Sequence, residues 1–345
     1  MVEFELVMGW WWGGEGLGRR QRNYKLGDNV VFDCFKNRLE ISGKLMTITA
    51  LRISAGRSTE PIGSDLPVIK DALGKPLIPG ASFKGALRSR LESFLRGIDP
   101  SLAANPTLEA ESSIPAKSIR DSDNRILRRG LEQIKQDIEE ELKDDPKKQF
   151  KMDKKLTKII IDILKHEDLT SHLFGSPWLA SKFQVRDLMV LSDYWFGQYQ
   201  ERDGVAIDRD TETAADGKLY DFQVVPAGTP FAFKAVVENA EDWELGLLMI
   251  GLHQFEMEQI PLGGGRSRGL GVVKLEVERM DWFDARDESN RDEVDAGKLL
   301  NYLKKMVNNE GSAYEDGKGY KDQWVQSLIG YLENLENQNA EVNTR

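Results

Sequence analysis

The chain has 345 residues, of which 40% are hydrophobic and 30% charged, and its formal net charge is −10. This length exceeds that of a typical single domain, and the composition predicts a soluble, globular protein with a sizeable core. No apolar run approaches the roughly 20 residues that span a bilayer, and the net charge argues against a protein covered by nucleic acid on all sides.

One cysteine, Cys34, allows no internal disulfide and suits a reducing cytosol. With only three histidines, no structural zinc site is expected. The first residues lack the basic segment of a signal peptide, so we expect a cytoplasmic protein with no membrane partner. Basic side chains gather near 70–90 and 266–268, whereas acidic ones crowd into 132–168 and 276–345. This segregation predicts one cationic surface on an acidic body.

Residues 1–38 are interpreted as an N-terminal extension. Its Trp10–Trp12 run suits stacking on bases, docking on a partner or packing on the chain's own surface, and the sequence leaves these uses open. Residues 39–54 predict the first strand, because apolar residues of one parity alternate with polar ones and β-branched residues are frequent.

The segment that follows predicts the first helix. Pro79 and Gly80 have turn chemistry, and the helix is expected to start near Ser82 or Phe83, with the Ser82 side chain accepting a hydrogen bond from a free amide. Lys84 and Arg88 form a basic row beside the apolar face. A helix N-terminus with two such cations can hold a phosphate. Taken alone, however, the segment favours an ordinary amphipathic helix with solvated cations.

The rest of the chain predicts alternating strands and helices. Residues 97–180 are interpreted as a largely helical insertion with a charged, disordered centre. The remaining expected elements are a strand at 183–196, a projecting hairpin at 198–225, a strand at 231–237, a helix at 241–255, a strand around 273–277 and a C-terminal helical extension at 281–345.

The order strand, helix, strand, strand, helix, strand is that of an α+β, ferredoxin-like (RRM-like) βαββαβ core, here over residues 39–280. In such a core four antiparallel strands carry two helices on one face. The open face of the sheet is then a platform suited to single-stranded RNA.

A glycine-rich loop at 261–271 lies between the second helix and the last strand. Only glycine permits this density of positive φ angles and close backbone approach, and Arg266 and Arg268 supply phosphate contacts. Neither the Walker pattern nor the dinucleotide-binding pattern fits its spacing. We interpret it as a grip on an RNA backbone, with a loose connecting loop as the alternative.

Four motifs in order carry a resemblance to a known family: Pro79 to Arg88, Leu173-Phe174-Gly175, Ile207-Asp208-Arg209 with Pro226 to Thr229, and the glycine-rich loop. Together they resemble the RAMP proteins of CRISPR–Cas systems, and more narrowly the Csm/Cmr-like backbone subunits (the Cas-seven group) of type III effector complexes. The resemblance covers about residues 39–280.

The resemblance implies how the chain works. Backbone subunits of this kind bind the CRISPR guide RNA and assemble with other RAMP subunits and a large Cas subunit, while a thumb hairpin, here 198–225, wedges the duplex of guide and target RNA. Carried over by motif, the residues expected on the guide are Ser82, Lys84, Arg88, Gly264, Gly265, Arg266 and Arg268.

The resemblance also implies the cleaving residue. The family's target-cleaving aspartate precedes a segment like Pro67-Val68-Ile69-Lys70-Asp71, which indicates Asp65 here, a carboxylate able to hold Mg²⁺ or accept a proton. Arg52 is expected to stabilise developing charge on the phosphate. The plainer interpretation of Asp65 is a turn residue before proline.

The sequence leaves three alternatives open. The chain can be a non-catalytic RNA-binding assembly subunit of the same complex. It can also be a guide-processing RAMP endoribonuclease, although such enzymes usually employ a histidine or tyrosine and the first histidine here is His166. A stand-alone RNA-binding protein of the recognition-motif type is the third, but no matching aromatic strand signature is present.

Overall fold

The computed structural model describes residues 34–54, 56, 64–105, 108, 111–112, 114–120, 124, 126–146, 148–207, 214–308 and 313–343. The predictions for the Trp10–Trp12 run and for the hairpin tip at 208–213 lie outside these residues. In the part of the chain described, no helix is both long and apolar enough to cross a lipid bilayer.

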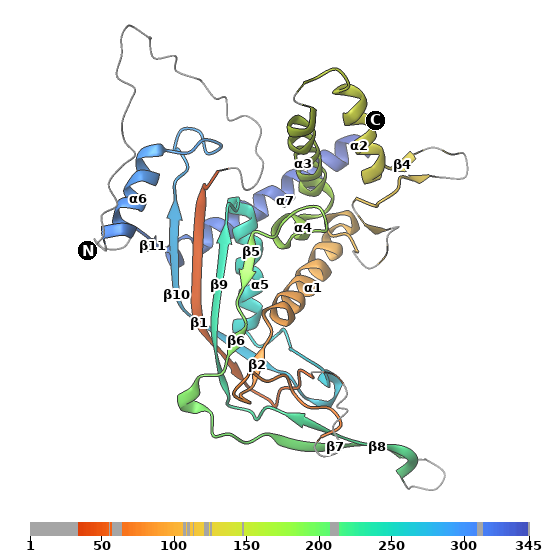
Figure 1. The fold of residues 1–345 in the computed structure, drawn as a ribbon, viewed down its shortest axis with the longest axis vertical. Helices are drawn as coiled ribbons and strands as arrows, with labels where there is room; N and C mark the ends of the chain where they lie inside the picture. Colours follow the sequence, from red (N-terminus) through yellow and green to blue (C-terminus); the bar gives the residue numbers. More distant parts are fainter. Residues whose placement is uncertain are drawn as a thin grey trace, which may run out of the picture.

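A five-stranded sheet forms the centre of the molecule (Figure 1). Its order is β11-β10-β1-β9-β5, and every neighbouring pair is antiparallel. The strands are β1 (Asn37–Thr47), β5 (Phe183–Val185), β9 (Pro230–Glu238), β10 (Val273–Asp284) and the edge strand β11 (Glu315–Asp316).

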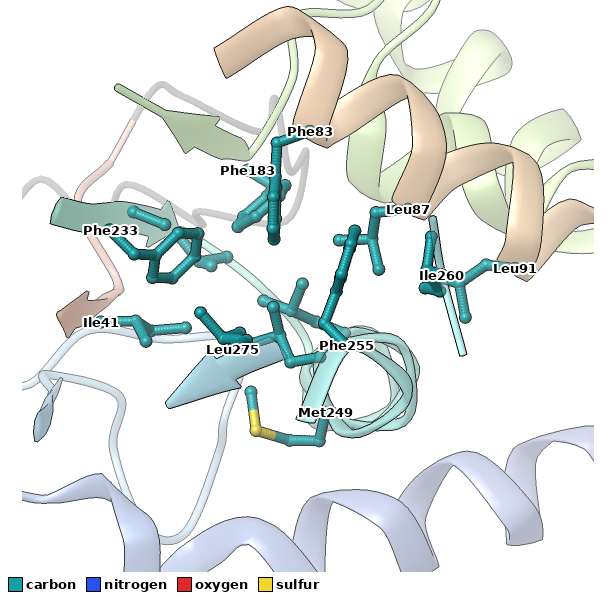
Figure 2. Close-up of a cluster of buried hydrophobic side chains, with 14 of the residues drawn as sticks. Ile41, Phe83, Leu87, Leu91, Phe183, Phe233, Met249, Phe255, Ile260 and Leu275 are labelled. Carbon is teal, nitrogen blue, oxygen red and sulfur yellow. The ribbon is translucent and has the colours of Figure 1, made fainter. Parts of the chain in front are cut away.

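Two helices, α1 (Gly80–Ile98) and α5 (Asp242–Glu256), cover one face of this sheet. Alternate residues of β1, such as Ile41 and Leu45, point to this face and are buried because side chains on a strand alternate. Figure 2 shows α1 side chains meeting those of the sheet and α5. The Phe83 ring lies 4.3 Å from that of Phe255 and 5.0 Å from that of Phe233.

The opposite, open face of the sheet carries paired charges. Lys44 lies 2.7 Å from Glu278, and Arg38 lies 2.5 Å from Glu238. None of the residues that β1 and β9 direct to this face is aromatic, and Phe283 of β10, which lies opposite Arg38, is buried against Tyr302 of the C-terminal region. A base-stacking platform needs aromatic side chains. The structure therefore gives no support to the predicted use of this face for single-stranded RNA.

The first strand begins two residues earlier and ends seven residues sooner than the predicted 39–54. After Thr47 the chain leaves the sheet, because the amides of Ile48 and Thr49 both bond to the carbonyl of Val272. Leu51 then pairs with Val225 instead of continuing β1. The segment 48–54 thus lies between the hairpin and the glycine-rich loop.

The second predicted strand, 183–196, is also shorter than expected. β5 stops at Val185, and Asp187 turns away to accept a hydrogen bond from the backbone of Gly80 at 2.8 Å. A two-residue strand β6 (Leu188–Met189) then pairs with β2 (Leu77–Ile78), and a 3₁₀ turn covers Ser192–Tyr194.

Besides a 3₁₀ turn at Pro100–Leu102, the described residues of the insertion form a short hairpin and three α-helices. These are β3 (Ile119–Arg120), β4 (Ile126–Arg128), α2 (Leu131–Glu141), α3 (Lys148–Glu167) and α4 (Leu169–Phe174). The prediction of a disordered centre is wrong for α2. Ile134 and Ile138 share one helix face and are buried in a small cluster of their own with residues of α3, so a narrow apolar stripe organises this charged segment.

The hairpin consists of β7 (Gln200–Ile207) and β8 (Ala214–Val224), paired antiparallel, and it projects from the body in Figure 1. At its base, Phe222 and Val224 are buried with Ala50 and Leu270. The hairpin is therefore anchored on the segment after β1 and on the glycine-rich loop.

The C-terminal region adds α6 (Ala296–Asn308) and α7 (Lys321–Asn343). α7 packs on α5: Trp324 is buried, and a Cβ on Gly246 would come within 2.1 Å of its carbonyl oxygen. Trp243 of α5 stacks on Tyr331 at 4.7 Å. A second layer of helix thus covers the first.

Candidate RNA-binding and cleavage site

Asp65 lies beside strand β8. Its backbone N–H donates to Oδ1 of Asp221 at 2.9 Å. The next residue, Leu66, forms a parallel bridge with Phe222, and its carbonyl accepts from the amide of Gln223 at 3.1 Å. The loop that carries Asp65 is therefore held by the base of the hairpin.

Two predicted arginines border the same stretch of β8. The Arg52 guanidinium carbon lies 4.5 Å from the centre of the Phe222 ring, a cation–π contact. Arg268 donates from Nη1 to the Tyr220 hydroxyl at 2.9 Å, and this hydrogen bond lowers the pKa of Tyr220. Asp65, Arg52 and Arg268 are thus gathered around residues 220–222 although they are distant in the sequence.

The glycine-rich loop reaches this site through its backbone. The amide of Gly264 donates to the carbonyl of Arg52 at 2.9 Å. Gly263 has φ +73°, and a Cβ there would lie 2.1 Å from the same oxygen, so the fold itself requires glycine at this position. Nothing lies within 4 Å of a Cβ placed on Gly264. Packing therefore leaves Gly264 open to an approaching ligand.

A groove of about 520 Å³ separates α1 from the glycine-rich loop. The α1 side contributes small and polar residues, and the loop contributes Arg266. Its lining residues are Ala81, Ser82, Gly85, Ala86, Ser89, Arg90, Ser93, Gln259, Ile260, Pro261, Gly263 and Arg266. The two predicted RNA-contacting segments therefore do meet, with Ser82 and Arg266 in the same groove.

Ser82 does not cap the helix as predicted. α1 begins at Gly80, and its N-cap residue is Pro79, which makes no side-chain cap bond. The carboxylate of Asp187 takes the first amide instead, and a carboxylate at a helix N-terminus is favoured by the helix dipole. The first backbone amide of the helix, expected to bind a phosphate, is thus already hydrogen-bonded to a protein side chain.

Lys84 and Arg88 lie on another face of α1, toward α4 and β5. Lys84 Nζ donates to Ser181 Oγ at 2.6 Å, and burial lowers the pKa of Lys84. Arg88 donates to the Gly175 carbonyl at 2.9 Å, and it also bonds to Ser171 Oγ and Glu92. These contacts give both side chains a structural use away from the groove.

Sequence reasoning missed a buried ionic cluster in the core. The Glu244 carboxylate lies 2.5 Å from His172 Nδ1 and 2.6 Å from Lys182 Nζ, and all three residues are buried. Burial lowers the pKa of His172. Although burial alone would raise the pKa of Glu244, the neighbouring His172 and Lys182 lower it to about 2. Because these three residues lie in separate parts of the chain, no local sequence pattern predicts that they meet.

The oxygen atoms around Asp65 suit a hard cation. Among the described residues, no group of three or more His, Cys, Asp or Glu side chains could hold a metal ion. The Asp221 carboxylate is bonded to the backbone of Asp65 and not to its side chain, so Asp65 itself offers one carboxylate, and two buried oxygens nearby in the sequence, Ser64 Oγ and Gln223 Oε1, lack a hydrogen-bond partner. Mg²⁺ usually binds one or two carboxylates together with substrate phosphates and water, so these residues fit it.

A family model described as the RAMP superfamily matches residues 44–274. The chain belongs to the RAMP superfamily. This confirms the resemblance drawn from the four sequence motifs. The matched residues of this RAMP protein include Asp65, the α1 segment and the whole glycine-rich loop, whereas α6 and α7 lie beyond the match.

Three curated relatives carry the name CRISPR system Cms endoribonuclease Csm3. The protein from Enterococcus italicus is 24% identical over 248 residues, which cover 71% of this RAMP protein and 92% of the relative. The protein from Mycobacterium tuberculosis is 45% identical over 56 residues, 16% of this chain and 24% of the relative. The protein from Methanocaldococcus jannaschii is 41% identical over 58 residues, 16% and 23% of the two chains.

Proposed function

We propose that this RAMP protein is a guide-RNA-binding backbone subunit of a type III CRISPR effector complex in the cytoplasm and that it cleaves target RNA paired with the guide. The names of its relatives support the class of complex and the endoribonuclease activity. The observation that carries the proposal is the gathering of Asp65, Arg52 and Arg268 at the base of the hairpin, next to the groove that contains Arg266.

A ferredoxin-like core is the fold that this proposal requires. The four strands β1, β5, β9 and β10 are antiparallel in the order β10-β1-β9-β5, and α1 and α5 cover one face. In chain order these elements read strand, helix, strand, strand, helix, strand, with the insertion between α1 and β5. The order supports the assignment.

The guide is proposed to follow the groove between α1 and the glycine-rich loop. Arg266 provides positive charge, and Gly264 and Gly85 leave open backbone where a phosphate can approach. Arg268 and Gly265 extend this surface toward β8. Target RNA, paired with the guide, would then pass the Asp65 loop at the base of the hairpin, which fills the role of a thumb.

Cleavage needs little protein chemistry because RNA carries its own nucleophile, the 2′-hydroxyl. Asp65 would hold Mg²⁺ together with phosphate oxygens of the target, and the ion would supply charge stabilisation at the reacting phosphate. Arg52, fixed over Phe222, would add a second positive charge. Positioning of a stretched nucleotide supplies the remainder of the rate enhancement.

The decisive experiment uses the protein purified with its native partners. Bound RNA is sequenced, and cleavage of a matching target is followed in Mg²⁺ and in a chelator. Asp65→Ala is expected to lower the cleavage rate by roughly two orders of magnitude or more while the bound guide is unchanged. Unchanged cleavage by Asp65→Ala would leave a non-catalytic assembly subunit as the function. Absence of any guide-like RNA would reject the proposal as a whole.

A further inference from the structure

Strand β8 holds the proposed catalytic residue by a side-chain hydrogen bond that joins residues 156 apart in the chain. The carboxylate Oδ1 of Asp221 accepts from the backbone N–H of Asp65 at 2.9 Å. Because the bond is to the backbone, it constrains the peptide that directs the Asp65 side chain. It leaves the Asp65 carboxylate free for chemistry.

The position of Asp221 is itself fixed by packing. Its neighbours along the strand, Phe222 and Val224, are 4% and 0% exposed and anchor β8 in a small apolar cluster. Side chains on a strand alternate, so Asp221 and Gln223 share the opposite side. The Leu66 carbonyl, which accepts from the Gln223 amide, ties the loop to the strand one residue after Asp65.

The same strand also grips the glycine-rich loop, because the residue before Asp221 is Tyr220, whose hydroxyl accepts from Arg268 at 2.9 Å. Adjacent residues of β8 therefore contact the loop proposed to cleave and the loop proposed to hold the guide. A displacement of the hairpin base would alter both contacts together.

We propose that Asp221 is a positioning residue for Asp65, through which the base of the β7–β8 hairpin sets the orientation of the cleaving carboxylate. This inference rests on the proposed function, because it assigns Asp221 a role in the same reaction. Its role is that of a hydrogen-bond acceptor. The amide oxygen of an asparagine at position 221 can accept the same hydrogen bond, whereas the methyl group of an alanine cannot.

The test compares Asp221→Ala and Asp221→Asn in the assembled, guide-loaded complex at saturating target. Asp221→Ala is expected to lower the single-turnover cleavage rate by about 10- to 100-fold, because a small misplacement of a reacting group is costly. Target affinity and bound guide stay at wild-type levels. Asp221→Asn retains the wild-type rate within about threefold, since its Oδ1 can still accept the amide hydrogen.

Asp203→Ala is the matched control, because Asp203 faces Asp221 across the hairpin in the β7–β8 register and is exposed. It removes a carboxylate of the same type from the paired position on β7, while the bond between Asp221 and Asp65 stays in place. The control is expected to cleave at the wild-type rate. Since two like charges opposite one another destabilise a strand pair, it should not weaken the hairpin.

Amide hydrogen exchange of the peptide containing residues 64–66 gives a readout that does not depend on activity. In the protein without target, exchange of the Asp65 amide is expected to be faster in Asp221→Ala, by roughly tenfold or more, and unchanged in Asp221→Asn and Asp203→Ala. A merely structural role would speed exchange throughout the hairpin instead.

The outcomes separate this inference from the proposed function. If Asp65→Ala cleaves normally, the proposed function fails. If Asp65→Ala is inactive but Asp221→Ala cleaves as wild type, only the positioning role is overturned. Equal defects in Asp221→Ala and Asp221→Asn also overturn it, because the charge of Asp221 would then matter. So would an Asp221→Ala protein that does not fold or assemble, since Asp221 would then serve the fold.

Discussion

Arg266 and Arg88 belong to the two segments expected on the guide, but the structure gives them different surroundings. Arg266 is exposed in the groove, whereas Arg88 is half-buried and its three guanidinium nitrogens bond to Glu92, Gly175 and Ser171. Arg88, whose guanidinium is bonded to three protein acceptors, contributes to the stability of the free protein. Arg266, which faces the open groove, is available to bind phosphate.

Substitution of these two arginines should therefore separate RNA binding from stability. Arg266→Ala is expected to weaken guide binding and to reduce the slope of log affinity against log salt by about 0.7, the value for one phosphate contact on a single strand, with an unchanged melting temperature. Arg88→Met should leave that slope unchanged and lower the free energy of unfolding by about 2 kcal/mol, because it removes charged hydrogen bonds. Binding titrations at several salt concentrations and urea denaturation measure both. If instead Arg88→Met reduced the slope and Arg266→Ala did not, Arg88 would contact the guide and Arg266 would not.

At the scale of the element, α1 presents one apolar face to the core and a second, small-residue face to the groove. Periodicity predicted the first face, because Phe83, Leu87 and Leu91 recur at helical spacing and are all fully buried. It could not predict which of the other faces meets the glycine-rich loop. That depends on Asp187 and α4, which fix the position of the helix from a distant part of the chain.

Gly85 tests the groove face of α1 directly, because nothing lies within 4 Å of a Cβ placed there. Glycine in a helix interior is less favourable than alanine, so Gly85→Ala should raise the free energy of unfolding by about 0.5–1 kcal/mol. The added methyl group enters the groove, and guide affinity should fall at the same time. Gly97→Ala, which is also unhindered but outside the groove, serves as the control and should bind guide normally. Unchanged binding by Gly85→Ala would place the RNA backbone elsewhere.

At the scale of the whole molecule, local patterns predicted the chain order of four sheet strands and two helices, but not the edge strand β11 or how the elements meet. The alternation from 39 to 54 is continuous, yet β1 ends at Thr47 because Val272 captures the following amides. The Asp65 loop depends likewise on Asp221, 156 residues away. Motifs could nominate Asp65, Arg52 and Arg268, but only the tertiary structure shows β8 as their common neighbour.

The buried cluster of Glu244, His172 and Lys182 links that tertiary structure to pH. The pKa of Glu244 is lowered from 4.5 to about 2, so its stabilising effect is complete above pH 4.5 and is lost as the pH falls toward 2. The pKa of His172 is also lowered, so the unfolded chain takes up its proton first as the pH falls below 6.5. Both effects have the same sign. The protein should lose stability steadily on acidification, as urea denaturation at pH 7, 5 and 4 would measure.

Substitutions identify the cluster as the source of that loss. Glu244→Gln leaves the Lys182 ammonium buried without its counter-charge, and it should cost about 3–5 kcal/mol at pH 7 while flattening the acid dependence. Adding Lys182→Met removes the stranded charge and should recover much of the loss, since replacing a whole buried ion pair is often close to neutral. A Glu244→Gln protein with wild-type stability and an unchanged pH profile would show that the acid sensitivity arises elsewhere. The cluster matters for both helices on the sheet face, because Glu244 belongs to α5. The packing of α5 against α1 in turn positions α1 and the groove beside it.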